Sequence, residues 1–202
     1  GRSAQGQAAA ASHTGALAGS DLVYDAAIRR AGMLRVDSLQ DLFVAAEALS
    51  HLRGRVLGDE RAALEALTIV TNGGGAGVMA ADAAAGSGLM LATLPPTVRE
   101  RLDGHLPANW SRANPVDLIG DAPVERYVQT LQALLDDPGT GSLLFMHAPT
   151  AIVPSAEIAR ALVPVLQPAG ERVLSCWLGD PGVAEARQIF QDAGLPQYDT
   201  PE

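Results

Sequence analysis

A histidine with hydroxyl neighbours lies near the start of the sequence and could carry phosphoryl chemistry. Ser12 and Thr14 flank His13, and Gly15 follows them. A neutral imidazole nitrogen can accept and donate a phosphoryl group when nearby donors hold the phosphoryl oxygens, and glycine lets the backbone approach an anion. Taken alone, His13 would be interpreted as a solvated loop histidine, and its neighbours are what favour phosphoryl transfer.

Two further turns could hold a phosphate through their backbone amides. Asn72, Gly73 and Gly74 follow an apolar run of strand length and precede an expected helix. Thr150 and Ser155 belong to a second tract between a strand and a helix. A tight turn without a ligand is the alternative for the first, which lacks the GxGxxG spacing of dinucleotide-binding loops, and an ordinary capped helix is the alternative for the second.

Composition excludes several other kinds of chemistry. The net charge of −9 argues against general nucleic-acid binding, and the absence of lysine excludes a P-loop or a Schiff base within this stretch. Cys176 is the only cysteine, so an internal disulfide is excluded, and its apolar surroundings predict a buried, inert thiol. The four histidines lack ligand spacing, so no metal site is expected, and no stretch has the length of a membrane span.

Alternating strands and helices must position the residues after 66. The expected strands are 67–71, 89–91, 114–118, 142–146 and 172–177, and the expected helices are 76–85, 96–102, 123–136, 154–166 and 181–193. This alternation predicts an α/β domain with a flavodoxin-like, doubly wound, mostly parallel sheet. Ligands bind at the carboxyl ends of such strands, which selects the loops 72–77, 114–122, 147–155 and 179–182. In the second loop, Asn114 and Asp117 could face a ligand or, more commonly, satisfy backbone groups.

The first 52 residues contain fewer expected strands and helices than the rest of the chain. We expect a loop over 1–19, a helix from Ser20-Asp21 to Gly32, a strand over 33–36 and a helix capped by Asp37-Ser38. These elements are too few to bury a core, so we interpret residues 1–52 as the incomplete end of a second such domain, 53–66 as a junction and 67–202 as a whole domain. A start without methionine suggests a fragment.

The sequence resembles a known family at several segments. Residues 1–21, 24–27, 30–32, 70–74 and 114–117 are similar to NDP-forming acyl-CoA synthetases of the succinyl-CoA synthetase superfamily. The first of these segments, which contains Ser12-His13-Thr14-Gly15, resembles their phosphohistidine segment. The resemblance implies that an acyl-CoA and phosphate give an acyl phosphate, that His13 takes the phosphoryl group, and that a swinging loop delivers it to ADP or GDP. It also implies two ligase domains whose helix N-termini stabilise phosphohistidine, here from the loop around Thr150 to Ser155, with Asn72, Gly73 and Gly74 nearby.

The same resemblance implies what the fragment lacks. The family has a CoA-binding domain and an ATP-grasp domain, in the same chain or a separate subunit, so CoA or acyl-CoA, ADP or ATP and Mg²⁺ are expected only in the full-length protein. A carboxylate that orients His13 is also missing, and the junction at 58–66 is longer than usual. We expect the fragment alone to bind no cofactor and to be inactive. We expect a cytoplasmic protein without nucleic-acid or membrane partners. The sequence leaves open whether the protein forms a homo-oligomer.

A different class of protein carries a similar region. GNAT-type protein lysine acetyltransferases contain it as a regulatory module that senses acyl-CoA, and residues 114–155 resemble those proteins at least as closely. The retained Ser12-His13-Thr14-Gly15 segment favours phosphoryl chemistry.

Overall fold

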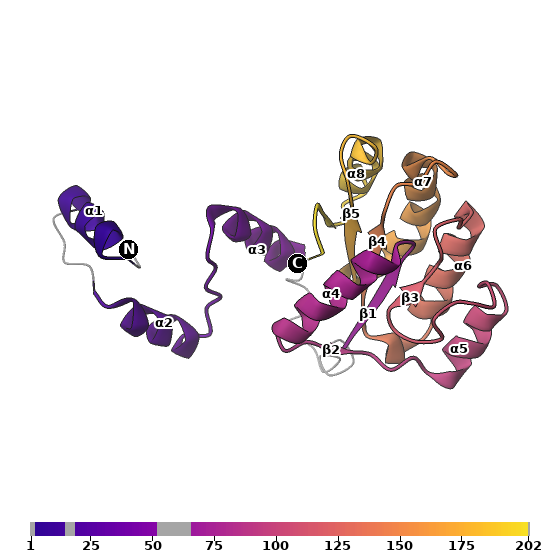
Figure 1. Ribbon diagram of the computed structural model, residues 1–202, viewed down its shortest axis with the longest axis horizontal. Helices are drawn as coiled ribbons and strands as arrows, with labels where there is room; N and C mark the ends of the chain where they lie inside the picture. Colours follow the sequence, from indigo (N-terminus) through magenta and orange to yellow (C-terminus); the bar gives the residue numbers. More distant parts are fainter. Residues whose placement is uncertain (1–2, 15–18, 52–65, 202) are drawn as a thin grey trace. The chain divides into compact units, whose positions relative to one another are not determined.

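The computed structural model describes residues 3–14, 19–51 and 66–201. The chain separates into two compact units, Gly1–Ala46 and Glu47–Glu202 (Figure 1). Within the described residues, the helices are too short or too polar to cross a membrane. The junction expected at 53–66 lies almost wholly outside the described residues.

The smaller unit begins with a helix that the sequence analysis did not predict. Helix α1 spans Ala4–Thr14, so the expectation of a loop over 1–19 is wrong for these residues. The segment has no apolar period, which suggested a loop, but it is rich in alanine, the residue with the highest helix propensity. His13 and Thr14 are the last two residues of this helix, and Gly15 lies outside the described residues.

The next two helices agree with expectation. Helix α2 spans Asp21–Arg30, and Gly32 follows it with φ of 68°. Helix α3 spans Leu39–His51, and Ser38 and Asp41 cap each other reciprocally, with both N–H···O distances at 3.0 Å. Residues 33–36 form no strand, because no described strand pairs with them. The Arg35 side chain ties this extended segment to Asp21 and Asp25 of α2.

The larger unit is built on a parallel sheet. Its strands are β1 (Ala66–Thr71), β2 (Met90–Leu91), β3 (Val116–Asp117), β4 (Ser142–His147), β5 (Val173–Trp177) and β6 (Gln197–Tyr198). Their order is β2-β1-β4-β5-β6, with β3 also paired to β1, and every pair is parallel. This arrangement confirms the α/β, doubly wound expectation. Strand β6 was not predicted, because two residues are too short to show an alternation.

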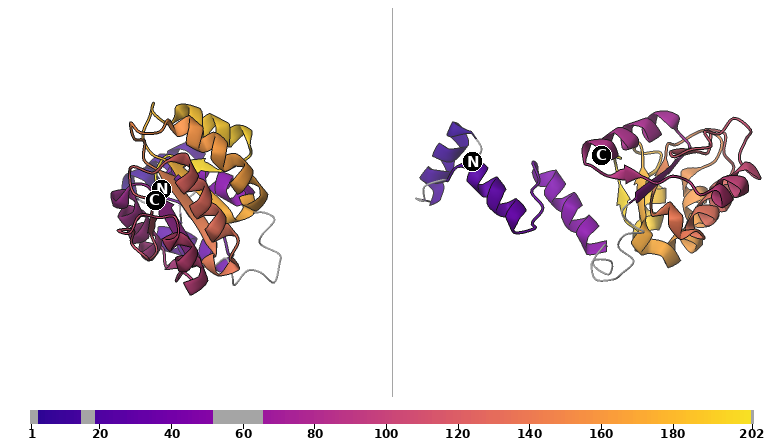
Figure 2. Two further views of the ribbon diagram at one scale, coloured as in Figure 1. Left: turned by 90° about the vertical axis from the view of Figure 1, so that its right-hand side faces the viewer. Right: turned by 90° about the horizontal axis from the view of Figure 1, so that it is seen from below.

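Helices cover both faces of this sheet (Figure 2). They are α4 (Gly74–Gly86), α5 (Pro96–Asp103), α6 (Val124–Leu135), α7 (Ser155–Leu166) and α8 (Ala184–Asp192), with short 3₁₀ turns η2 (Pro138–Thr140) and η3 (Gln167–Arg172). Helix α4 packs on the face that carries Ile69 and Met146, and the other helices pack on the face that carries Phe145. The two cores therefore share one sheet.

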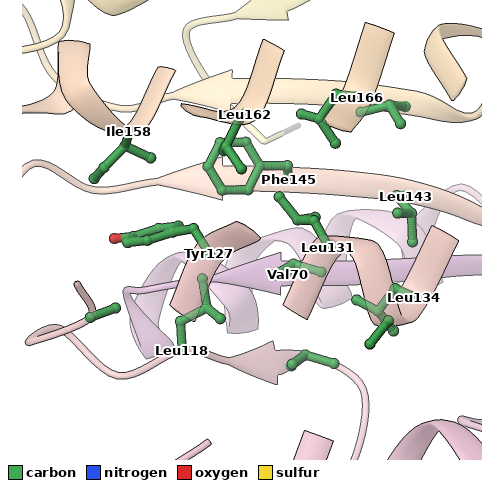
Figure 3. Close-up of a cluster of buried hydrophobic side chains, with 14 of the residues drawn as sticks. Val70, Leu118, Tyr127, Leu131, Leu134, Leu143, Phe145, Ile158, Leu162 and Leu166 are labelled. Atoms are coloured by element: carbon green, nitrogen blue, oxygen red, sulfur yellow. The ribbon is translucent and has the colours of Figure 1, made fainter. Parts of the chain in front are cut away.

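The core on the Phe145 face is the larger one. Figure 3 shows leucines of α6 and α7 packed over β1 and β4, with the aromatic ring of Tyr127 among them. Each fully buried side chain of this kind contributes about 1.5–3 kcal/mol by leaving water. This packing fixes the helices relative to the sheet and thereby places the loops at its carboxyl edge. The labelled side chains are Val70, Leu118, Tyr127, Leu131, Leu134, Leu143, Phe145, Ile158, Leu162 and Leu166.

Candidate functional site

All strands of the larger unit end at one edge of the sheet, because every pair is parallel. From β1 the chain continues to β2 and β3 on one side, and from β4 it continues to β5 and β6 on the other. The connections therefore diverge between β1 and β4, which is the switch point where ligands bind in open α/β sheets. The loop after β1 and the loop after β4 flank this point.

Asn72 joins the two loops at the switch point. Its side chain is buried, its Nδ2 donates to the carbonyl oxygen of Ala148 at 2.8 Å, and its Oδ1 accepts from the Ala148 amide at 2.8 Å. Both polar ends of the amide are thus engaged by the backbone. Any effect of Asn72 on phosphate therefore acts through the position that it gives to the loops.

The glycines after Asn72 allow the loops to approach closely. A Cβ atom on Gly73 would lie 3.2 Å from the Cβ of Ala148, and one on Gly74 would lie 3.2 Å from Oδ2 of Asp117. The Gly73 amide donates to Thr71 Oγ1 at 3.0 Å. Helix α4 begins at Gly74, and the first amides of a helix have no intrahelical acceptor; here no side chain caps them, and the Gly77 amide is the one that donates to the Gly73 carbonyl oxygen. This turn is a ready anion-binding element if a ligand reaches it.

Asn114 and Asp117 serve the backbone, which is one of the two roles that the sequence leaves open. Asn114 Nδ2 donates to the carbonyl oxygens of Leu67 and Ala92 at 2.7 and 3.0 Å, and its Oδ1 accepts from the Ile69 amide at 2.9 Å. Asp117 Oδ1 accepts from the Ile119 amide at 2.8 Å. Asn114 therefore belongs to the sheet, whereas Asp117 holds the loop beside the start of α4.

The loop after β4 contains the second phosphate-binding candidates. Thr150 Oγ1 accepts from the Ile152 amide at 3.4 Å. Ser155 is the first residue of α7, and the preceding Pro154 provides no side-chain cap. The Glu157 amide in the first turn of α7 donates to the Pro154 carbonyl oxygen at 3.0 Å, whereas the amides of Ser155 and Ala156 precede the first intrahelical bonds, as do the first amides of α4. The loop at 179–182 lies next to this one, because Cβ atoms on Gly179 and Gly182 would lie 3.6 and 3.7 Å from Pro149.

His147 is a buried residue of this edge that sequence reasoning did not select. Its ring is fully buried, with Nε2 3.1 Å from Ser155 Oγ and Nδ1 3.3 Å from the Tyr127 hydroxyl. Burial lowers the pKa of His147 to about 4, so the ring is neutral at pH 7. The only signal in the sequence was its place at the end of a strand, eight residues before Ser155.

His13 belongs to the smaller unit, whereas the four loops belong to the larger one. The neighbouring Ser12 Oγ donates to the carbonyl oxygen of Ala9 at 2.8 Å, within α1. Among the described residues, no group of three or more histidine, cysteine or carboxylate side chains could hold a metal ion. His13 therefore lies in one unit, and the loops with their amide and hydroxyl groups lie in the other.

Comparisons with known families match both parts of the chain. Residues 67–201 match the family described as the ligase-CoA domain, and residues 1–49 match the succinyl-CoA ligase like flavodoxin domain. The chain is 37% identical over 201 residues to acetate–CoA ligase [ADP-forming] I of Archaeoglobus fulgidus, covering all of this chain and 27% of that protein. It is 36% identical over 204 residues to acetate–CoA ligase [ADP-forming] I subunit alpha of Pyrococcus furiosus, covering all of this chain and 42% of that protein.

A solved structure is similar over the same length. It is the dinucleotide forming acetyl-coenzyme A synthetase 1 of Ca. Korarchaeum cryptofilum in complex with phosphate and ADP, with a TM-score of 0.88 and 33% identity. The match covers all of this chain and 42% of that one. The chain thus spans between about a quarter and two fifths of the length of these similar proteins.

Proposed function

The chain belongs to the ligase-CoA domain family, and from this premise we propose that it is part of an NDP-forming acyl-CoA synthetase. The likeness over the whole chain, in sequence and in structure, to ADP-forming ligases carries this proposal. The reaction converts acyl-CoA, phosphate and ADP to carboxylic acid, CoA and ATP.

The reaction divides into three displacements. A phosphate oxygen attacks the acyl carbon of the thioester, and CoA leaves as the thiol, so that an acyl phosphate forms. A neutral ring nitrogen of His13 then attacks phosphorus, and the carboxylate leaves. Finally, an oxygen of the ADP β-phosphate attacks the phosphohistidine, which restores the imidazole and forms ATP. Ser12, Thr14 and Gly15 are proposed to bind phosphate beside His13.

The larger unit would stabilise the transferred group. The proposed phosphate-binding residues are Asn72, Gly73 and Gly74 after β1, and Thr150 and Ser155 after β4. Three observations support this assignment: both loops flank the switch point, both precede uncapped helix starts, and Asn72 holds them together. Preorganised amides and hydroxyls of this kind stabilise charge that develops on phosphoryl oxygens.

The remaining parts of the proposed enzyme lie on other segments. We assign residues 1–52 to the first ligase domain, 53–66 to a junction and 67–202 to the second ligase domain. A CoA-binding domain and an ATP-grasp domain would supply the sites for acyl-CoA and for ADP with Mg²⁺, in the same chain or in a separate subunit. The name of the Pyrococcus furiosus relative, a subunit alpha, supports the second arrangement. We propose a cytoplasmic location for the reaction, because the proposed substrates are acyl-CoA and ADP.

Phosphorylation of His13 tests the proposal. The full-length protein is incubated with ATP labelled in the γ-phosphate, and we expect acid-labile, base-stable label that His13→Ala abolishes. His51→Ala, a histidine variant at the end of α3, serves as the matched control and should keep the label. Label that persists in His13→Ala would contradict the assignment of His13 as the phosphorylated residue.

The chain of 202 residues alone is proposed to be inactive. Incubated with acetyl-CoA, phosphate and ADP, it should form no ATP above the background without protein. Measurable ATP synthesis would contradict the assignment of the CoA and nucleotide sites to other segments. The relatives described above carry ligase names, and no observation on the described residues favours the acetyltransferase alternative.

A further inference from the structure

Three buried polar side chains form a line from the core to the start of α7. Tyr127 lies on α6, His147 ends β4 and Ser155 begins α7, and these residues are 1%, 0% and 6% exposed, respectively. The Tyr127 hydroxyl lies 3.3 Å from Nδ1 of His147, and Nε2 of the same ring lies 3.1 Å from Ser155 Oγ. Figure 3 shows the Tyr127 hydroxyl directed toward the carboxyl ends of the strands.

The burial of these groups determines where the protons lie. Burial raises the pKa of the Tyr127 hydroxyl, which therefore keeps its proton. Phe145 packs edge-on to the Tyr127 ring, and His147 Nδ1 is the acceptor that lies within reach of the hydroxyl. A buried hydroxyl proton without an acceptor is costly, so Tyr127 donates to Nδ1. The neutral ring must then carry its own proton on Nε2, from which it donates to Ser155 Oγ.

The proton on Nε2 of His147 fixes the orientation of the Ser155 hydroxyl. Ser155 Oγ accepts a hydrogen bond from Nε2–H, so the hydrogen of the serine hydroxyl points away from His147. The reverse arrangement would use the serine hydrogen in the bond to the ring and would leave the Tyr127 hydrogen facing apolar side chains. The line of hydrogen bonds therefore runs in one direction, from Tyr127 through His147 to Ser155.

We propose that Tyr127 and His147 are positioning residues that make Ser155 a fixed hydrogen-bond donor to the phosphoryl group at the start of α7. This inference rests on the proposed phosphoryl transfer. A serine in water reorients its hydroxyl as charge develops, whereas this one is already oriented, which is the property that lowers the barrier in preorganised sites. Pro154 has no side-chain donor, so Ser155 supplies the hydroxyl next to the first-turn amides of α7.

The protonated nitrogen of His147 can be observed without any activity. In the chain of 202 residues labelled with ¹⁵N-histidine, we expect the Nε2–H form for His147 in the wild type. Tyr127→Phe removes the donor to Nδ1 but keeps the ring, so the Nδ1–H form should become populated. An Nδ1–H form in the wild type would overturn the inference and leave the proposed function intact.

The effect on phosphoryl transfer is measured in the full-length protein as the rate of His13 labelling. Tyr127→Phe and Ser155→Ala should each slow labelling roughly 10- to 100-fold, the loss typical of one oriented donor to a charged group. Both variants interrupt the same series of hydrogen bonds, so the double variant should be no slower than Ser155→Ala. If the two variants acted through independent packing defects, their fold losses in rate would multiply. Ser155→Thr keeps the hydroxyl and should restore most of the rate.

Thr130→Val provides the matched control. Thr130 lies on the same helix as Tyr127 and is also buried, and its Oγ1 contacts a different histidine, His105, at 3.1 Å. This variant should label at the wild-type rate. A wild type without label overturns the proposed function and the inference together. A labelled wild type with Tyr127→Phe and Ser155→Ala as fast as Thr130→Val overturns the inference alone.

Discussion

His147 and Cys176 are titratable side chains that the core of the larger unit keeps uncharged at neutral pH. Both are fully buried, and desolvation disfavours the charged form of each. Burial therefore lowers the pKa of the His147 imidazole to about 4 and raises the pKa of the Cys176 thiol to about 12. Cys176 is thus the buried, unreactive thiol that the sequence predicts. His147 differs because both of its ring nitrogens have polar neighbours.

The low pKa of His147 predicts that stability falls in mild acid. Between pH 6.5 and about 4 the unfolded chain binds a proton at this histidine that the folded chain does not bind. The free energy of unfolding should therefore decrease as the pH falls through this window, by about 3 kcal/mol for the shift from 6.5 to about 4. His147 should add no further loss below the window. Urea denaturation at pH 7 and at pH 4.5 measures the change.

His147→Gln isolates this contribution from that of other groups. The variant has no titratable side chain at this position, so its free energy of unfolding should decline less steeply between pH 7 and pH 4.5. Burial also lowers the pKa of His105, but that histidine is present in both proteins. Equal pH dependence in the wild type and the variant would contradict the assignment.

One edge of β1 is shared by two short strands. Strand β2 pairs with β1 at Ala66 and Leu67, and β3 pairs with it at Val70 and Thr71. The Asn114 side chain fills the interval between them, because it bonds the backbone of Leu67, Ile69 and Ala92. The two short strands thereby act as one interrupted strand. This arrangement holds the loop of Asp117 beside the start of α4.

Removal of the Asn114 amide should destabilise the sheet. Asn114→Ala removes the hydrogen bonds that its side chain makes to the Ile69 amide and to the carbonyl oxygens of Leu67 and Ala92, of which the Leu67 oxygen still accepts from the Ala92 amide at 2.9 Å, and the loss should cost about 2–4 kcal/mol. Asn109→Ala, at an exposed turn, is the control and should change stability by less than about 0.5 kcal/mol. The urea midpoint of each variant measures the difference. Similar midpoints for the two variants would show that Asn114 is dispensable.

The buried core of the described residues lies in the larger unit. The buried hydrophobic side chains begin at Leu67, and helices α2 and α3 contain no buried residue. Large apolar side chains of the smaller unit are instead exposed, among them Leu22, Leu34 and Phe43. The larger unit therefore has the apolar burial that drives cooperative folding, and the smaller one does not.

The larger unit should consequently fold without the smaller one. A chain of residues 47–202 should unfold cooperatively with a urea midpoint close to that of the 202-residue chain. A peptide of residues 1–46 should show helical circular dichroism that decreases gradually on heating, without a cooperative transition. A large fall in the midpoint of residues 47–202 would show that the first 46 residues contribute to stability.

Sequence reasoning identified the α-helices of the larger unit and, apart from β6, its strands, because their patterns are local. The apolar run that became β1 and the glycine turn after it are visible within about ten residues, and the strand–helix alternation predicts their parallel arrangement. Helix α1 was missed because its helix-forming signal is the high propensity of alanine, which produces no periodic pattern of apolar residues in the sequence. An amphipathic helix that buries one face does produce such a pattern. The strand expected at 33–36 was wrong because a strand depends on a partner that a local pattern does not reveal.

The sequence by itself determined the candidates for chemistry: the residues around His13, the turn at Asn72 and the tract from Thr150 to Ser155. Only the tertiary structure decided how the larger unit connects its candidates. Asn72 and Ala148 are 76 residues apart, and Tyr127 and His147 are 20 apart, yet each pair is in hydrogen-bonding contact. Such contacts depend on strand order and on which face of the sheet a helix covers. These are properties of the packed core, and residue spacing in the sequence does not encode them directly.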